Sequence, residues 1–202
     1  MTPIILAAGA SRRMGRPKAL LEFDGRRCLE LALEAVAGQG TPIVVLGPNQ
    51  REIRAAVPLE RVRVGYNLDV ESGQTASLKA GLALLPADVE AFFFMPVDLP
   101  LLTPADIARL VDAWRSNRDP LKSIFIPSHQ MKRGHPVLCR RDLAAEILSL
   151  PPGSPVREWI NRDPRRVGYV LSPEAYVLMD MDTPEDYVRC PGAYRARNSR
   201  NP

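Results

Sequence analysis

The segment Leu6–Lys18 combines small side chains with basic ones in an order suited to holding phosphate. Residues 7 to 11 are Ala, Ala, Gly, Ala and Ser, which let a ligand approach the backbone, while Gly9 and Gly15 permit turns that other residues resist. Free N–H groups in such a turn form an anion-binding concavity. Arg13 can make bidentate contacts with phosphate oxygens, and Lys18 adds a compact positive charge. This pattern predicts a triphosphate-binding loop, and the alternative is a solvated basic turn.

The loop differs from the two commonest phosphate-binding motifs. A P-loop needs Ser or Thr directly after its lysine, and here Ala19 follows Lys18. A dinucleotide-binding fingerprint needs three glycines, and positions 9, 11 and 14 are Gly, Ser and Met. A dehydrogenase of the Rossmann type is therefore disfavoured.

Two aspartates that lie far apart in the chain are candidate ligands for a divalent cation. Asp98 follows the apolar run Ala91–Met95, and Asp182 follows the run Tyr176–Met179 just before a helix start. Mg²⁺ prefers oxygen ligands and often uses only one or two carboxylates together with substrate phosphates. We expect both aspartates at the sheet edge that carries the phosphate loop. The alternative is that they cap helices or turns.

Short apolar runs alternate with amphipathic stretches along the chain, which predicts βαβ units and a mainly parallel sheet. The predicted strands are Pro3–Ala8, Ile43–Leu46, Val62–Tyr66, Ala91–Met95, Ser123–Ile126, Pro136–Cys139, Val167–Leu171 and Tyr176–Met179. The predicted helices are Leu29–Ala37, Gln50–Ala56, Ala76–Leu85, Pro104–Trp114, Asp142–Leu148 and Val156–Ile160. Thr103 and Thr183 each precede a proline and an acidic residue, the pattern of a capped helix start.

The length of 202 residues suits one domain. We expect that domain to span residues 1–190, followed by a basic, flexible C-terminal tail over residues 191–202. This last segment is rich in arginine and contains Pro191 and Gly192.

Charge and cysteine content limit the classes of function. The net charge of +4 comes from 27 basic and 23 acidic residues, a balance too even to indicate nucleic-acid binding. The three cysteines, Cys28, Cys139 and Cys190, are odd in number and lack metal-site spacing, which favours a reducing compartment. No apolar run approaches the roughly 18 residues of a membrane span, and the opening lacks the basic start of a signal peptide. We therefore expect a cytoplasmic protein without nucleic-acid or membrane partners.

The sequence LAAGASRRMGRPKALL at the phosphate loop resembles the signature of the MobA-like nucleotidyltransferases, most closely their molybdenum cofactor cytidylyltransferase branch. Four later segments fit the family's order, and the resemblance covers roughly residues 2 to 187. They are Gly73–Leu78, Pro96–Pro100, Gly134–Leu138 and Asp180–Pro184. The resemblance implies an α/β fold of Rossmann-like, three-layer type, with a mainly parallel but mixed central sheet, as in nucleotide-diphospho-sugar transferases.

The resemblance also implies an activity: a phosphorylated acceptor attacks the α-phosphorus of a nucleoside triphosphate and releases pyrophosphate. Arg13, Lys18 and Asp98 would be catalytic, and Asp98 and Asp182 would bind Mg²⁺ as the cofactor. The implied nucleotide-binding residues are Leu6, Ala7, Ala8, Gly9, Arg13, Lys18, Asn67, Gly73, Gln74 and Ser77. Because an acceptor phosphate is already ionised at neutral pH, the reaction needs no strong general base.

The choice of base and acceptor rests on the same resemblance. Ala8 and Pro17 are typical of the cytidylyl branch and favour CTP, whereas Gln74 stands where relatives more often carry another residue. The implied acceptor is molybdopterin, with a molybdoenzyme or a cofactor-carrier protein as a further partner. His135 is a candidate acceptor contact, and its alternative is a hydrogen-bonded turn residue.

Two other functions stay open at this point. One is the same chemistry with another nucleoside triphosphate or with a sugar-phosphate acceptor. The other is a non-catalytic nucleotide-binding partner in molybdoenzyme maturation, against which the intact Arg13, Lys18, Asp98 and Asp182 argue.

Overall fold

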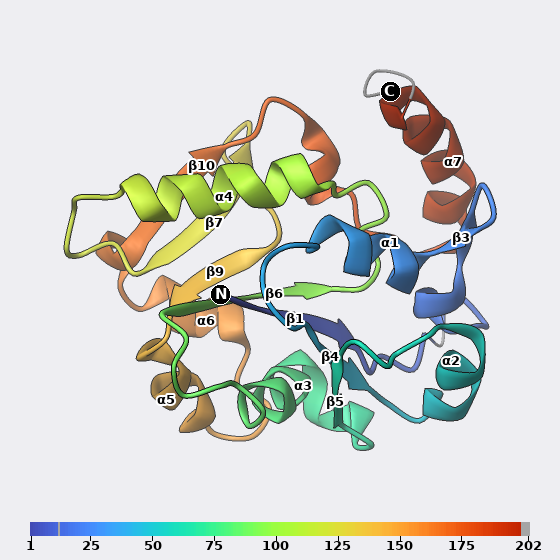
Figure 1. Cartoon of the computed structure of the whole chain (residues 1–202), viewed down its shortest axis with the longest axis horizontal. Coiled ribbons are helices and arrows are strands. Elements are labelled where there is room, and N and C mark those ends of the chain that lie inside the picture. Colours follow the sequence, from blue (N-terminus) through green and yellow to red (C-terminus); the bar gives the residue numbers. More distant parts are fainter. Residues whose placement is uncertain (12, 199–202) are drawn as a thin grey trace.

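The computed structural model describes residues 1–11 and 13–198, and a central sheet runs through them (Figure 1). In this described part the sheet has eight strands in the order β10-β7-β9-β6-β1-β4-β5, with β8 paired to β7. Their bounds are β1 Thr2–Ala7, β4 Ile43–Leu46, β5 Arg63–Tyr66, β6 Ala91–Pro96, β7 Ile124–His129, β8 Lys132–Arg133, β9 Val137–Arg140 and β10 Val167–Leu171. A separate antiparallel pair joins β2 (Glu22–Phe23) to β3 (Arg26–Arg27).

The sheet is mixed but mainly parallel. Strand β1 pairs in parallel with both β4 and β6, and β4–β5 and β7–β10 are also parallel. Strand β9 lies antiparallel between β6 and β7. The predicted α/β fold with a mainly parallel, mixed sheet is therefore confirmed.

Helices cover both faces of the sheet and make three layers (Figure 1). Helices α1 (Cys28–Ala35), α2 (Gln50–Ala56), α4 (Pro104–Ser116) and α7 (Pro184–Asn198) contribute to one hydrophobic core. Helices α3 (Gly73–Leu82), α5 (Leu143–Leu148) and α6 (Val156–Asn161) contribute to the other. The strands alternate between the two cores, since Ile5 and Phe93 pack in the first, and Ile4, Phe92 and Phe94 in the second. Burial on both faces explains why these strands lack polar residues.

Both predicted helix starts are confirmed. The carboxylate of Asp106 accepts hydrogen bonds from the backbone N of Thr103 at 2.9 Å and from its hydroxyl at 2.8 Å. At the start of α7, the carboxylate of Asp186 accepts from the backbone N and the hydroxyl of Thr183, both at 2.9 Å. Each acid therefore satisfies groups that a bare helix end would leave unpaired.

The predicted strand Tyr176–Met179 is wrong. Residues Ala175–Leu178 form a 3-10 turn instead, and the carbonyl of Val177 accepts a hydrogen bond from the backbone N of His135 at 3.0 Å. The neighbouring Gly134 permits this approach, since a Cβ there would lie 2.3 Å from the same carbonyl oxygen. Val177 in this apolar run is thus buried against the loop that contains Gly134 and His135, and the run does not join the sheet.

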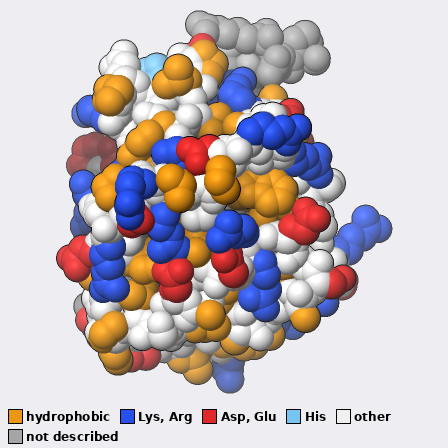
Figure 2. Space-filling model, turned by 90° about the vertical axis from the view of Figure 1, so that its left-hand side faces the viewer, with side chains coloured by type: hydrophobic (Ala, Val, Ile, Leu, Met, Phe, Trp, Pro, Cys, Tyr) orange, Lys and Arg blue, Asp and Glu red, His pale blue; other side chains and the backbone are white. Residues whose placement is uncertain are grey.

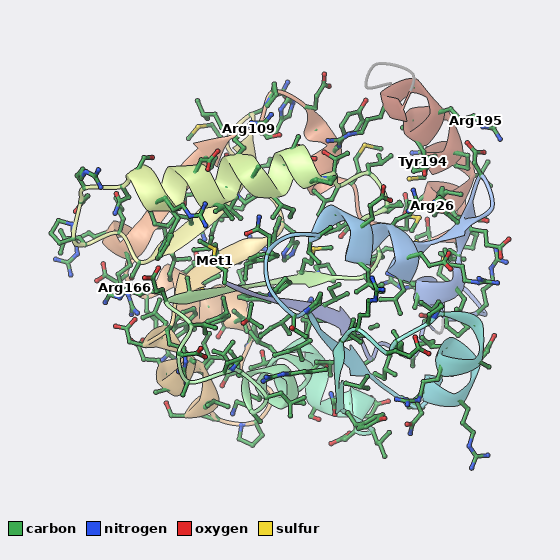
Figure 3. All side chains as sticks on the ribbon, in the orientation of Figure 1. Met1, Arg26, Arg109, Arg166, Tyr194 and Arg195 are labelled. Atoms are coloured by element: carbon green, nitrogen blue, oxygen red, sulfur yellow. The ribbon has the colours of Figure 1, made fainter. Side chains whose placement is uncertain are left out.

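Residues 191–198, which the sequence predicts to belong to a C-terminal tail, form the last turns of α7, and residues 199–202 lie outside the described residues. Cys190 and Tyr194, four residues apart on one helix face, are both buried. The ring of Tyr194 lies 5.8 Å from that of Phe23 in β2, and Arg195 forms an ion pair with Asp24. Figure 3 labels Tyr194 and Arg195 on this helix. The sequence signal for this packing was the apolar pair at helical spacing within an arginine-rich segment.

Charges are interleaved on the face shown in Figure 2, where basic and acidic side chains alternate with apolar ones. Arg166 bonds to Glu146 at 2.9 Å, and Arg165 bonds to Asp163 at 2.9 Å. The three cysteines are buried and free. Within the described residues, no helix combines the length and apolar character required to cross a bilayer.

Tyr194→Ala should destabilise the protein by about 2–4 kcal/mol, because it removes a buried aromatic ring that packs between α7 and β2. Chemical unfolding of the variant and the wild type would measure the difference in free energy of unfolding. Val188→Ala, in the same helix and 77% exposed, is the matched control and should change that free energy by less than about 0.5 kcal/mol. Equal, small effects of both substitutions would contradict a packed C-terminal helix.

Candidate functional site

The phosphate loop and Asp98 share one edge of the sheet because β1 and β6 end side by side. Leu6 in β1 stands opposite Pro96 in β6, and the backbone N of Val97 donates to the carbonyl of Leu6 at 3.1 Å. The chain leaves both strands at this point, so the loop that follows β1 lies next to Asp98. Carboxyl ends of parallel strands are where ligands usually bind in such sheets.

Ser11 closes the phosphate loop. Its carbonyl accepts from the backbone N of Met14 at 2.9 Å and of Gly15 at 3.1 Å, and its hydroxyl accepts from the backbone N of Lys18 at 3.0 Å. Gly15 has a φ of 66°, which fits its predicted role in the turn. Among the described residues of the loop, Ser11 (φ 51°) is also left-handed, whereas Gly9 is not. A Cβ at Gly9 would meet nothing within 4 Å, so this glycine borders open space.

A cavity of about 330 Å³ lies along this edge, within the size range of ligand sites. The predicted site residues that line it are Leu6, Ala7, Ala8, Gly9, Arg13, Lys18, Gly73, Gln74, Ser77, Asp98 and Asp182. It is also lined by residues that sequence reasoning did not assign to the site: Ser11, Met14, Pro17, Ala19, Pro96 and Val97. The signal for finding them was present, because all of them lie within or next to the two motifs quoted for the loop and for Asp98.

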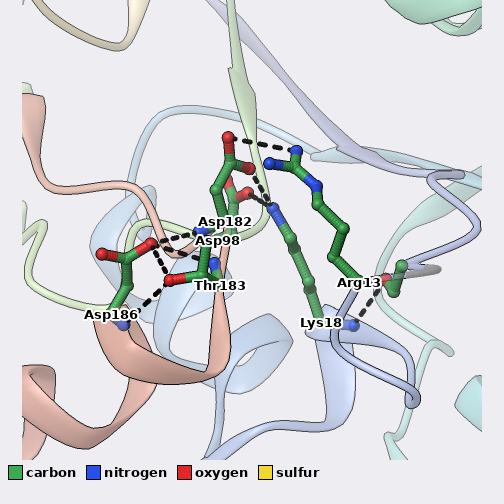
Figure 4. A network of polar contacts seen from close by, with 7 residues as sticks. Arg13, Lys18, Asp98, Asp182, Thr183 and Asp186 are labelled. Carbon is green, nitrogen blue, oxygen red and sulfur yellow. Dashed lines mark hydrogen bonds and ion pairs between the residues drawn. The ribbon is translucent and has the colours of Figure 1, made fainter.

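Four charged side chains meet at the wall of the cavity (Figure 4). The Nζ of Lys18 lies 2.6 Å from Oδ2 of Asp98 and 2.6 Å from Oδ1 of Asp182. The Nη2 of Arg13 lies 3.3 Å from the other oxygen of Asp182. Lys18 and Asp98 are mostly buried, with side chains 17% and 10% exposed, whereas Arg13 is 68% exposed. The structure thus brings together every residue predicted to be catalytic or to bind metal.

Asp182 reaches the cluster because its segment is fixed on both sides. The backbone N of Met181 donates to the carbonyl of Asp98 at 3.2 Å, and the backbone N of Asp182 donates to the carboxylate of Asp186 at 3.1 Å (Figure 4). In the residue that follows Asp186, the hydroxyl of Tyr187 donates to the carbonyl of Glu22 at 2.9 Å. The start of α7 is therefore held against both the end of β6 and the β2–β3 pair.

The proton affinities in the cluster follow from burial and from the ion pairs. Burial raises the pKa of Asp98, and the ammonium of Lys18 opposes that rise. Burial acts to lower the pKa of Lys18, but Asp98 and Asp182 outweigh it and the pKa is raised. The hydrogen bond from Lys18 lowers the pKa of Asp182, with a further contribution from Arg13. Burial, together with repulsion from Asp98 and Asp182, raises the pKa of Asp180. Lys18 is therefore held as an ammonium.

The carboxylates also fit a divalent cation. Oδ1 of Asp98 is buried and has no hydrogen-bond partner, although buried oxygens of this kind are nearly always paired. No group of three or more His, Cys, Asp or Glu side chains within the described residues is arranged to hold a metal ion. Two carboxylates nevertheless suffice for an ion such as Mg²⁺ when phosphate oxygens and water complete its shell.

Asn67 and His135 are not among the residues that line the cavity. The amide of Asn67 is buried and donates to the hydroxyl of Ser77 at 2.9 Å, so it orients a lining residue instead of facing the cavity itself. His135 lies where the loop before β9 meets the 3-10 turn at Val177. Gly73 and Gln74 lie in the first turn of α3, which begins three residues earlier than predicted.

Comparison with known proteins identifies the family. The profile of the MobA-like NTP transferase domain matches residues 3–167. The nicotine blue oxidoreductase of Paenarthrobacter nicotinovorans is 31% identical over 94% of this chain and 95% of its own. The molybdenum cofactor cytidylyltransferase of Escherichia coli K12 is 27% identical over 95% of each chain.

Solved structures agree with this assignment. The crystal structure of Rv0371c from Mycobacterium tuberculosis H37Rv superposes with a TM-score of 0.83 at 29% identity, covering 93% of this chain and 95% of that one. A second structure of that protein, in complex with manganese, gives a TM-score of 0.80 at 26% identity, covering 95% and 98%.

The family match confirms the resemblance seen in the sequence. The matched residues 3–167 include the phosphate loop and Asp98. This chain belongs to the MobA-like NTP transferase family and is a nucleotidyltransferase related to the molybdenum cofactor cytidylyl- and guanylyltransferases.

Proposed function

We propose that the chain transfers CMP from CTP to a phosphorylated acceptor, molybdopterin cofactor by analogy with its relatives, and that it uses Mg²⁺. The observation that carries this proposal is the meeting of Arg13, Lys18, Asp98 and Asp182 at the wall of one cavity. Phosphoryl-group chemistry depends on positioning and charge neutralisation more than on a covalent residue. This cluster offers both.

The reaction forms a bond between an acceptor phosphate oxygen and the α-phosphorus and breaks the bond to the β-phosphate, so pyrophosphate leaves. Arg13 and Lys18 donate hydrogen bonds to phosphate oxygens and stabilise the charge that moves onto the leaving group. A bound Mg²⁺ supplies further neutralisation of phosphate charge. Asp98 and Asp182 hold the cation, and the ionised acceptor phosphate attacks without a general base.

The position of Ala8 in the wall of the cavity supports the proposed preference for CTP. This residue lines the cavity and is itself buried. Gly47 at the end of β4 backs onto it so closely that a Cβ there would lie 2.1 Å from the carbonyl oxygen of Ala8. Because Ala8 cannot retreat, its methyl group limits the space available to a purine. Gln74 and Ser77, in the first two turns of α3, supply amide and hydroxyl groups for the base or ribose.

The acceptor is proposed from the relatives. The Escherichia coli relative is named a molybdenum cofactor cytidylyltransferase and aligns over nearly the whole chain. A molybdoenzyme or cofactor-carrier protein is the corresponding proposed partner, and a cytoplasmic location stays a prediction. A guanylyltransferase that acts on phosphoenolpyruvate, from Rubrobacter xylanophilus, is 28% identical over 94% of this chain, so another nucleotide or acceptor is the nearest alternative.

A second candidate function comes from the relative named nicotine blue oxidoreductase, at 31% identity. An oxidoreductase reaction would need no triphosphate, and it would give the carboxylate pair no evident role as a metal site. Oxidation of NADH or NADPH by the protein in the presence of a dye, without release of pyrophosphate from any nucleotide, would favour this function.

The protonation state of His135 determines how its imidazole could bind an acceptor. Burial lowers its pKa to about 4, against a weaker opposing effect of Asp180. Its Nδ1 is buried without a partner. We therefore propose His135 as an acceptor contact in its neutral form, without the charge that an imidazolium would present to a phosphate.

Lys18→Ala and Asp98→Ala should each lower turnover by roughly 10²–10³-fold, because Lys18 would neutralise phosphate charge directly and Asp98 would hold the cation that does so. Pyrophosphate release would be measured with Mg²⁺, each of CTP, GTP, ATP and UTP, and phosphorylated acceptors that include molybdopterin. CTP should give the highest rate. Arg109→Ala, in an exposed ion pair on α4 (Figure 3), is the control and should retain wild-type turnover. Unchanged rates in the Lys18 and Asp98 variants would refute the roles proposed for these residues. A wild-type protein that shows no turnover and binds no triphosphate would refute the proposed function.

His135 should make the protein less stable as the pH falls from 7 to 5. The folded protein binds the imidazole proton only near pH 4, whereas the unfolded chain binds it near pH 6.5, so protonation favours unfolding within this interval. The loss attributable to His135 is about 2 kcal/mol. Urea unfolding at both pH values should show that His135→Gln loses correspondingly less stability than the wild type. Identical pH dependence in the two proteins would contradict a neutral His135 in the folded protein.

A further inference from the structure

Lys18 occupies the place between the two carboxylates that a metal ion would use. Its Nζ lies 2.6 Å from an oxygen of Asp98 and 2.6 Å from an oxygen of Asp182. With Arg13 bonded to the second oxygen of Asp182, two carboxylates face two cationic side chains. This four-residue charge cluster is therefore already neutral on its own.

We propose that the protein takes up its divalent cation together with the triphosphate, as a metal–nucleoside triphosphate complex, and that Lys18 excludes the metal alone. Lys18 transfers its ammonium from the carboxylates to the phosphates when the complex binds. This inference rests on the proposed function, which it deepens by naming the form of the nucleotide that the site accepts.

The exclusion follows from distance and charge. Mg²⁺ lies about 2.0–2.1 Å from its carboxylate oxygens. A cation that used the same oxygens of Asp98 and Asp182 would stand almost in contact with the Nζ of Lys18. Two cations at such a separation repel each other strongly, most of all at a site where Lys18 and Asp98 are largely shielded from water. The metal can therefore bind these oxygens only if the lysine leaves them.

The triphosphate offers the ammonium of Lys18 new counter-ions within the same cavity. The backbone of Lys18 is fixed by the hydroxyl of Ser11, while its four-carbon stem allows the ammonium to swing. Both the ammonium and the open space above Gly9 belong to the same cavity. Arg13, which is largely exposed, can follow by releasing Asp182. The phosphates thus replace the carboxylates as counter-ions of both basic residues, and the carboxylates become available to the metal.

The unpaired oxygen of Asp98 supports the same exchange. Oδ2 of this residue accepts from Lys18, whereas Oδ1 is buried with no partner. A buried acceptor without a donor costs free energy unless something else satisfies it. A metal ion bound at Asp98 would satisfy it, and an ammonium that donates only to Oδ2 does not.

The test is a titration of the nucleotide-free protein with Mn²⁺, followed by the electron paramagnetic resonance signal of the free ion. Lys18→Met and Lys18→Gln should each bind Mn²⁺ about tenfold or more tightly than the wild type, in the range typical of coupled sites. Two neutral replacements are used so that the comparison with the wild type can still be made if one of the two variants fails to fold. Lys79→Met is the matched control, since this lysine of α3 donates to the carbonyl of Leu150 outside the cluster. It should bind Mn²⁺ no better than the wild type.

Thermal unfolding supplies a second readout. The neutral Lys18 variants should melt at a lower temperature than the wild type, because their buried carboxylate loses its partner, and Mn²⁺ should restore that temperature. Adding Asp98→Asn to either variant should abolish this restoration. The wild type and Lys79→Met should show no shift with Mn²⁺ alone.

Tight binding of Mn²⁺ to the nucleotide-free wild type, or equal Mn²⁺ affinities in the wild type and both neutral Lys18 variants, would overturn the inference. Binding of CTP is measured separately, by thermal shift of the wild type with Mg²⁺ and CTP together. Failure there would count against the proposed function, whereas failure of the Mn²⁺ comparison alone would overturn only the exchange at Lys18.

Discussion

The ammonium of Lys18, shared between Asp98 and Asp182, is the interaction on which the rest of the site depends. It joins three segments that are far apart in the sequence: the loop after β1, the end of β6 and the start of α7. The sheet brings the first two together through the pairing of Leu6 with Pro96. The cap at Asp186 and the backbone bond from Met181 to Asp98 add the third. The fold therefore holds two carboxylates around one ammonium, and we propose that a metal ion replaces this ammonium when the nucleotide binds.

Much of this arrangement could be predicted from the sequence because it depends on local patterns. The apolar runs at β1 and β6 predict parallel strands, and strands of that kind place the phosphate loop and Asp98 at one edge. The paired helix starts at Thr103 and Thr183 were also predictable, because threonine, proline and an acid at fixed spacing satisfy the first turn of a helix.

The rest depended on long-range contacts that no local pattern reveals. The apolar run at residues 176–179 looks like a strand, but it lies in a 3-10 turn whose Val177 carbonyl accepts from the distant backbone N of His135. The arginine-rich end of the chain looks like a solvated tail, but Tyr194 buries it against Phe23. The contacts of Lys18 with Asp98 and Asp182 could not be predicted from the sequence either. A basic residue in a phosphate loop indicates phosphate binding and gives no sign that the residue contacts carboxylates in the protein without nucleotide.

Relatives of this chain show that one fold carries several chemistries, since they include a protein named as an oxidoreductase beside cytidylyl- and guanylyltransferases. In this chain, the meeting of Arg13, Lys18, Asp98 and Asp182 is the observation from which we propose nucleotidyl transfer. The most direct measurement is a crystal structure of the protein with Mg²⁺ and a non-hydrolysable CTP analogue. We predict the metal at Asp98 and Asp182, with the Nζ of Lys18 on the phosphates. A structure in which Lys18 stays between both carboxylates while the nucleotide is bound would contradict the account.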